Sequence, residues 1–188
     1  TGAISADLTL GPAAVGQGVT LVGQASDITV GANRITRLDV DATVADALGV
    51  PLIDGTLQGS DLALGGVEVT SLTAEARQPD ANRMTFTAAS RFAIGTLADI
   101  EGSVERLNPG FGVTLDRLSL RQQRQSAELT APATITLREG TLTLTPLALA
   151  FDGGGALAAE GTLGDTADLT LDIRDLPRGR HELVVARQ

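Results

Sequence analysis

Apolar and polar residues alternate in short runs along most of the chain. Over residues 169–173, leucine and isoleucine alternate with threonine and aspartate, and the same alternation recurs over 38–44, 84–88, 135–137 and 142–144. A period of two places the apolar side chains on one face of a β-strand and the polar ones on the other. The pattern therefore predicts strands with one apolar face and one polar face.

Glycine, aspartate and proline mark the ends of these runs. Four runs between Ala133 and Asp175 are separated by Arg138–Gly140, Asp152–Gly155 and Gly164–Thr166. These residue types suit the backbone angles of tight turns. The whole chain divides into about 13 to 15 strands spaced about 8 to 12 residues apart, which indicates an all-β protein without a long helix.

Some local features are also predicted. Residues 18–23 and 27–30 resemble the two arms of a hairpin, and residues 45–48 suit one helical turn. A β-bulge is expected at Ser90–Arg91, where the alternation changes. Residues 78–82, which include Pro79, resemble an exposed loop.

Two all-β architectures fit this pattern. One is a closed β-sandwich, in which every apolar face is buried against a second sheet. The other is an elongated sheet that is curled into a groove with an apolar interior. In either case residues 1–177 are expected to form one β-rich domain, a fragment of a longer chain, and residues 178–188 a polar tail.

Composition narrows the chemistry. Hydrophobic residues make up 43% of the chain and aromatic residues only 2%, so the predicted core is aliphatic. The chain has neither cysteine nor lysine, which excludes thiolate metal sites and lysine-based covalent catalysis. Its net charge of −9 would repel nucleic acid phosphates, so nucleic acid is not an expected partner.

No stretch carries a convincing catalytic motif. Asp152–Gly155 is glycine-rich, but the run after it is too short for the helix that a nucleotide loop needs. His181, the single histidine, lies in the polar tail, and Asp39 and Asp41 suit a solvated face. No catalytic residue, metal or cofactor is predicted, and the protein is not expected to be an enzyme.

Three stretches resemble the TamB family, within the AsmA-like group of bridge proteins. They are residues 39–76, residues 89–165 and the segment ADLTLDIRDLP over 167–177. Within them, Gly110–Phe111 precedes a strand, and the sequence APATI and two glycine-containing strands follow, in the order of that family. The last dozen residues depart from it.

The resemblance implies a β-taco, which is a folded-over sheet with a hydrophobic groove. It implies a periplasmic protein whose parent chain is anchored in the inner membrane. The implied function is to shield phospholipid acyl chains in transport between the inner and outer membranes. The implied partners are phospholipid acyl chains, neighbouring segments of the same long chain and TamA, an outer-membrane barrel of the Omp85 family.

The alternation itself supplies candidates for lipid contact in such a groove. They are Met84, Phe86, Phe92, Ile94, Leu115, Ile135, Leu142, Leu144, Leu169, Leu171 and Ile173. An alternative function is an interaction module that assists the assembly of outer-membrane proteins or autotransporters by strand pairing with an Omp85-type partner. A third possibility, an adhesin-like or passenger-type sandwich, implies a dry core instead.

Overall fold

The computed structural model describes residues 2–13, 16–164 and 166–175, and these form one large antiparallel sheet. No helix occurs within these ranges. The thirteen strands are β1 (Ala3–Pro12), β2 (Gln17–Val30), β3 (Asn33–Ala45), β4 (Leu52–Leu64), β5 (Val67–Asp80), β6 (Arg83–Phe92), β7 (Leu97–Arg106), β8 (Phe111–Gln122), β9 (Gln125–Leu129), β10 (Ala133–Arg138), β11 (Thr141–Phe151), β12 (Ala156–Leu163) and β13 (Ala167–Arg174). The predicted all-β fold is confirmed.

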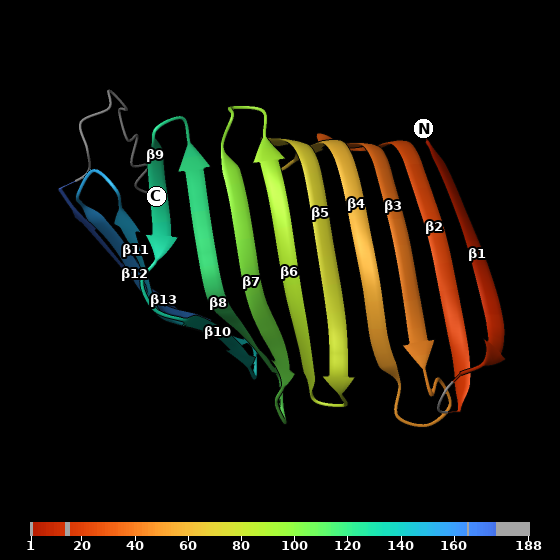
Figure 1. The fold of residues 1–188 in the computed structure, drawn as a ribbon. Coiled ribbons are helices and arrows are strands. Elements are labelled where there is room, and N and C mark those ends of the chain that lie inside the picture. Colours follow the sequence, from red (N-terminus) through yellow and green to blue (C-terminus); the bar gives the residue numbers. More distant parts are fainter. Residues whose placement is uncertain (1, 14–15, 165, 176–188) are drawn as a thin grey trace.

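Strand order in the sheet follows strand order in the sequence (Figure 1). The exception is β9 and β10, which share one position between β8 and β11. β9 pairs with the second half of β8 and β10 with its first half, so together they act as one interrupted strand. Strands β10–β13 curve away from the viewer at one side of Figure 1.

The two faces of the sheet differ throughout. Directly opposed residues in an antiparallel pair lie on the same face, so the strand registers define rows that cross the sheet. One central row runs from Ala6 and Gly23 through Val40, Leu57, Ala74, Ala88 and Ile100 to Leu118. The adjacent row on the other face runs from Asp7 through Val22, Asp41, Thr56, Glu75, Thr87 and Glu101 to Arg117.

Within several strands the apolar residues switch between odd and even positions. Local backbone irregularities at these points keep the apolar side chains on the same face. Asp27 in β2 and Asp61 in β4 have left-handed φ angles of 52° and 50°, a conformation that aspartate tolerates better than most residues. After Asp27 the apolar positions move from odd to even numbers, so Ala25 and Ile28 face the same side. Thr70 in β5 and Asp116 in β8 are extra residues that have the same effect.

A second line of irregularities crosses the C-terminal strands. It contains the bulge at Asp116, the gap between β9 and β10, and the register shift in β11 between Leu144 and Leu147. Thr145 joins β11 to β10 at this line. Its hydroxyl accepts a hydrogen bond of 2.7 Å from the amide of Thr134 and donates one of 3.2 Å to the Thr134 carbonyl. Within the described residues, the hydrophobic side chains that are buried lie mostly in β7–β11: Leu62, Ala98, Ala127, Ala133 and Leu149.

Several local predictions are wrong. Residues 17–30 are one strand, because the left-handed Asp27 continues the chain instead of reversing it. The extra residue near Ser90–Arg91 belongs to the facing strand, at Thr70. Strand β5 extends to Asp80, which leaves only Ala81 and Asn82 in the turn. Residues 46–49 form a turn closed by Asp46, and they do not form a helix.

Candidate functional site: an open apolar sheet face

The candidate site is the apolar face of the sheet. Besides the central row already described, a second row runs through Leu8, Leu21, Ala42, Gly55, Ala76, Phe86, Gly102, Leu115 and Ala133. A third runs through Ile4, Ala25, Leu38, Gly59, Leu72, Ser90, Ala98, Leu120 and Ala127. None of these three rows contains a charged residue. They form a continuous surface without charge.

This face is open rather than covered by a second sheet. All described strands belong to one sheet, and most apolar side chains on this face are half-buried or exposed. At the two sheet edges, Ile4 is 76% exposed and Leu171 is 61% exposed. In a sandwich such side chains would face a second sheet about 10 Å away. The groove architecture therefore describes this chain, and the sandwich does not.

The total surface area agrees with an open face. The accessible surface is 13034 Å². A compact monomer of 19.2 kDa exposes about 8,400 Å². Residues outside the described ranges account for about 2,500 Å² at most, even at the full area of an extended chain. An excess of about 2,100 Å² remains, which is larger than a typical protein–protein interface of about 1,600 Å².

Most of the predicted contact residues lie together on this face. One row contains Met84, Ile135, Leu144 and Leu169, with Val104, Val113 and Gly161 between them. The remaining candidates, apart from Ile94, occupy neighbouring positions on the same face: Phe86, Phe92, Leu115, Leu142, Leu171 and Ile173. Residues that are 50 to 85 positions apart in the sequence thus share one surface.

Ile94 does not belong to this face as predicted. It lies in the turn between β6 and β7 and is 74% exposed. The strand ends at Phe92, where the amide of Gly95 donates to the Phe92 carbonyl and closes the turn. The prediction extended the alternation two residues too far.

Sequence reasoning also missed residues at the opposite edge. Ile4, Leu8 and Leu10 of β1 lie on the apolar face and are largely exposed. Their alternation is as regular as that of β13, so the signal was present in the sequence. The predicted set therefore covers β6–β13, whereas the apolar face extends to β1.

All four phenylalanines lie on the apolar face. Phe86 is opposite Gly102, and an added Cβ on that glycine would lie 2.8 Å from Cζ of the Phe86 ring. The ring therefore covers the space that a side chain at position 102 would fill, an arrangement known to compensate for glycine in sheets. Phe92, Phe111 and Phe151 are opposite Val69, Leu137 and Ala127.

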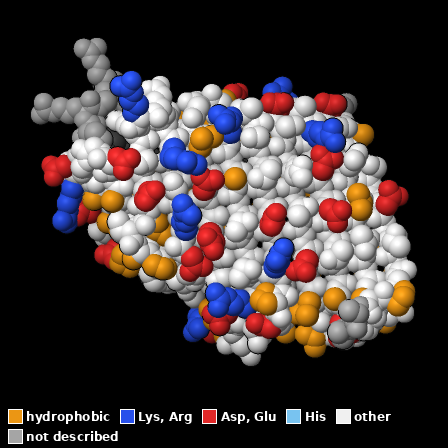
Figure 2. Space-filling model, viewed as in Figure 1, with side chains coloured by type: hydrophobic (Ala, Val, Ile, Leu, Met, Phe, Trp, Pro, Cys, Tyr) orange, Lys and Arg blue, Asp and Glu red, His pale blue; other side chains and the backbone are white. Residues whose placement is uncertain are grey.

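The opposite face is polar, and it is the face seen in Figure 2. Acidic and basic side chains are scattered over it, and hydrophobic side chains gather mainly along its lower margin (Figure 2). Threonine is frequent there, as in the row of Thr9, Thr20 and Thr43. A surface with this composition is well hydrated.

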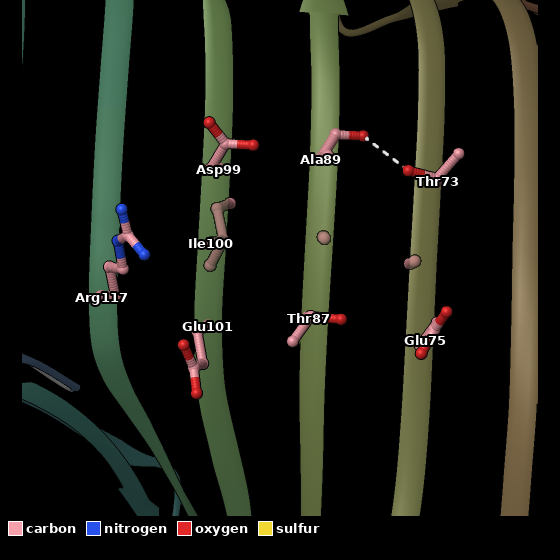
Figure 3. A pocket seen from close by; sticks show the side chains of 10 residues that line it. Thr73, Glu75, Thr87, Ala89, Asp99, Ile100, Glu101 and Arg117 are labelled. Atoms are coloured by element: carbon pink, nitrogen blue, oxygen red, sulfur yellow. Dashed lines mark hydrogen bonds between the residues drawn. The ribbon is translucent and has the colours of Figure 1, made fainter.

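A shallow depression on the polar face crosses β5–β8 (Figure 3). Glu75, Asp99, Glu101 and Arg117 line it together with threonines. Asp99 forms an ion pair of 2.7 Å with Arg121 on the next strand. In the part of the chain that the structure describes, no group of histidine and acidic side chains is arranged to hold a metal ion.

Two further ion pairs lie on the polar face, each between residues two positions apart in one strand. Arg37 Nε donates to Asp39 at 2.7 Å, and Arg174 Nε donates to Asp172 at 2.9 Å. These hydrogen bonds lower the pKa of both carboxyl groups below the usual value for aspartate. Both pairs are exposed, so they contribute little to stability.

The predicted polar tail over 178–188, with His181, lies outside the described residues. Among the residues that are described, no helix has the length and apolar character needed to cross a membrane. Comparison with protein-family models, with curated proteins and with solved structures finds no match for this chain. The fold and its two faces therefore define the class: a single curled antiparallel sheet with an open apolar face.

Proposed function

We propose that the apolar face binds the acyl chains of phospholipids and shields them from water. The observation that carries this proposal is a set of three adjacent rows without charge, on a face that remains open to solvent. Bridging proteins of the TamB type, which the sequence resembles, suggest the setting. In that setting the chain is a periplasmic segment of a longer protein anchored in the inner membrane, and lipid moves along it between the two membranes.

The dimensions of the face suit this ligand. Strand β2 has 14 residues, which corresponds to a length of about 46 Å, and the twelve strand positions give a width of about 50 Å. An extended acyl chain fits along either direction. Each fully buried methylene contributes about 0.8 kcal/mol, so a chain that half-buries about ten methylenes gains about 4 kcal/mol. Affinity of this size per acyl chain permits both binding and release.

The test is mass spectrometry of lipids that co-purify with the chain. Leu57→Arg places a charge at the centre of the face, and Leu171→Arg places one at its β13 edge. The matched controls, Gln58→Arg and Thr170→Arg, put the same charge on the polar face of the same strands. We expect phospholipid on the parent chain and on both controls, with strong loss in Leu57→Arg and partial loss in Leu171→Arg.

Two results would contradict the proposal. One is a parent chain free of lipid that also fails to bind a fluorescent fatty acid. The other is equal lipid retention in Leu57→Arg and Gln58→Arg, with both variants folded by circular dichroism. The second result would mean that lipid associates without using the apolar face.

A second candidate function is assistance in outer-membrane protein assembly by strand pairing with an Omp85-type barrel such as TamA. The observation that favours it is that, among the described residues, β1 and β13 each pair with a single neighbouring strand. In this case capture of a barrel would be lost when an edge strand is altered and retained in Leu57→Arg. For lipid content, the first proposal predicts the reverse: loss in Leu57→Arg, and retention when the backbone pairing of an edge strand is altered.

A further inference from the structure

One charged side chain lies on the apolar face. Arg106 is the last residue of β7, and it pairs with Phe111 at the start of β8. Phe111 lies on the apolar face, and directly opposed residues of an antiparallel pair share a face, so Arg106 lies there too. By the same registers, the other charged residues of the described strands occupy the polar face or irregular positions within a strand.

Arg106 has no ion-pair partner among the residues that the structure describes. The ion pairs found there belong to Arg37, Arg121 and Arg174, and all three lie on the polar face. Arg106 is exposed, and the carboxylate next to it in the sequence, Glu105, belongs to the opposite face. A guanidinium on a face without acidic groups can bind an anionic ligand without competition from a neighbouring carboxylate.

The position of Arg106 is the margin where the apolar face meets solvent. Strand β7 ends there, at the lower margin of the sheet in Figure 1. The backbone at this point is held from both sides, because the amide of Arg106 donates a hydrogen bond of 2.7 Å to the carbonyl of Asn82 and β8 pairs on the other side. The row that contains Arg106 continues with apolar residues across the next strands: Phe111, Leu137, Leu142 and Leu163.

We propose that Arg106 binds the phosphate of a phospholipid whose acyl chains lie on the apolar face. This inference rests on the proposed function and adds an orientation to it. The headgroup lies at the margin between β7 and β8, and the acyl chains extend from there along the strands. Arginine suits this role, because its guanidinium donates two parallel hydrogen bonds to phosphate oxygens, while its methylene stem can lie along an apolar surface.

The strands are long enough for the acyl chains. Strand β7 has ten residues, which corresponds to a length of about 33 Å. One acyl chain spans about half of the hydrocarbon core of a bilayer, or about 15 Å. Strands β10–β13 curve toward the apolar side, since Figures 1 and 2 share one view and the polar face is toward the viewer. Acyl chains that lie on β7 and β8 are thus flanked by the curved part of the sheet.

The experiment is isothermal titration calorimetry of the lipid-free chain with two soluble lipids that have identical acyl chains. Dioctanoyl phosphatidylglycerol carries the phosphate, and dioctanoylglycerol lacks it. We expect the parent chain to bind the phospholipid about fivefold more tightly, and this preference should shrink in 1 M salt. Arg106→Gln should lose the preference through weaker binding of the phospholipid alone. Its affinity for dioctanoylglycerol should change by less than about twofold.

Two further variants separate the charge at this position from charge in general. Arg106→Lys keeps a positive charge and should retain most of the preference, because lysine also binds phosphate. Arg83→Gln is the matched control. It removes a positive charge from the same margin of the neighbouring strand, but Arg83 lies on the polar face, where it opposes Glu105. The preference should therefore be unchanged in Arg83→Gln, and circular dichroism checks that each variant is folded.

The outcomes distinguish this inference from the proposed function. If the parent chain binds both lipids equally, acyl chains are bound but the phosphate is not recognised, and this inference is wrong. A preference that persists in Arg106→Gln, or that is lost equally in Arg83→Gln, also overturns it, because the phosphate is then bound elsewhere or by general charge. Displacement of the phospholipid by inorganic phosphate alone would overturn it as well, since the anion would then bind without the apolar face. If neither lipid binds, the proposed function fails and this inference fails with it.

Discussion

Two leucines on the same face should differ sharply in what they contribute to stability. Leu149 in β11 is 7% exposed and lies between Leu129 and Leu157, whereas Leu171 in β13 is 61% exposed. Replacing a buried leucine by alanine costs about 2 to 5 kcal/mol, so we expect about 3 kcal/mol for Leu149→Ala. Burial of a whole leucine side chain contributes about 1.5 to 3 kcal/mol. Because Leu171 is 61% exposed, only a little more than a third of its surface is buried. Leu171→Ala should therefore cost at most about 1 kcal/mol.

The assay is urea denaturation of lipid-free protein, followed by circular dichroism. With a slope of about 2 kcal/mol per molar urea, the midpoint should fall by about 1.5 M for Leu149→Ala and by less than about 0.5 M for Leu171→Ala. Lipid must be removed first, because a ligand that binds only the folded state stabilises it. Equal midpoint shifts for the two variants would refute the open face, since Leu171 would then have to be covered.

Three further predictions concern the backbone and the polar face. Gly102→Ala should lower the free energy of unfolding, measured by urea denaturation, by more than 1 kcal/mol, because the added methyl would overlap the Thr114 carbonyl. Gly11→Ala is the control and should be nearly neutral, because no atom lies close to the added methyl. Asp61→Val should cost about 1 to 2 kcal/mol and Asp61→Gly much less in the same assay, because the left-handed φ angle penalises a branched side chain; equal losses would contradict this. The Asp39 carboxyl should titrate below the usual pKa of about 3.9 by NMR, so its small stabilising effect is present above that pH and is lost as the pH falls through the lowered pKa.

Much of the fold could be predicted from local patterns. Alternation is a property of adjacent residues, so the strand type and the two faces of β6, β10 and β13 were evident without tertiary information. The four runs from Ala133 to Asp175 correspond to β10–β13, with turns where glycine occurs. For the same reason, most of the predicted contact residues share one face.

The remaining features depend on interactions that local patterns do not contain. Gly23 and Asp27 suggested a reversal, but pairing of β2 with both β1 and β3 keeps the strand extended through Asp27. The division of one strand position between β9 and β10 depends on the bulge at Asp116 in the neighbouring strand. Whether an aliphatic stripe is covered or open depends on distant strands, so alternation alone left the groove and the sandwich undecided.

Because strand order in the sheet nearly repeats strand order in the sequence, the protein behaves as a one-dimensional array. Within the part of the chain that the structure describes, strands come close to one another along the backbone only where they are neighbours in the sheet. Each hairpin then forms locally, with little loss of chain entropy, and adds to the edge of those already folded. The sheet can also be shortened or lengthened by whole hairpins in β1–β6 without breaking a closing contact, as in repeat proteins. Length would thus be a freely variable property of this architecture, and a longer array would carry a proportionally longer apolar face.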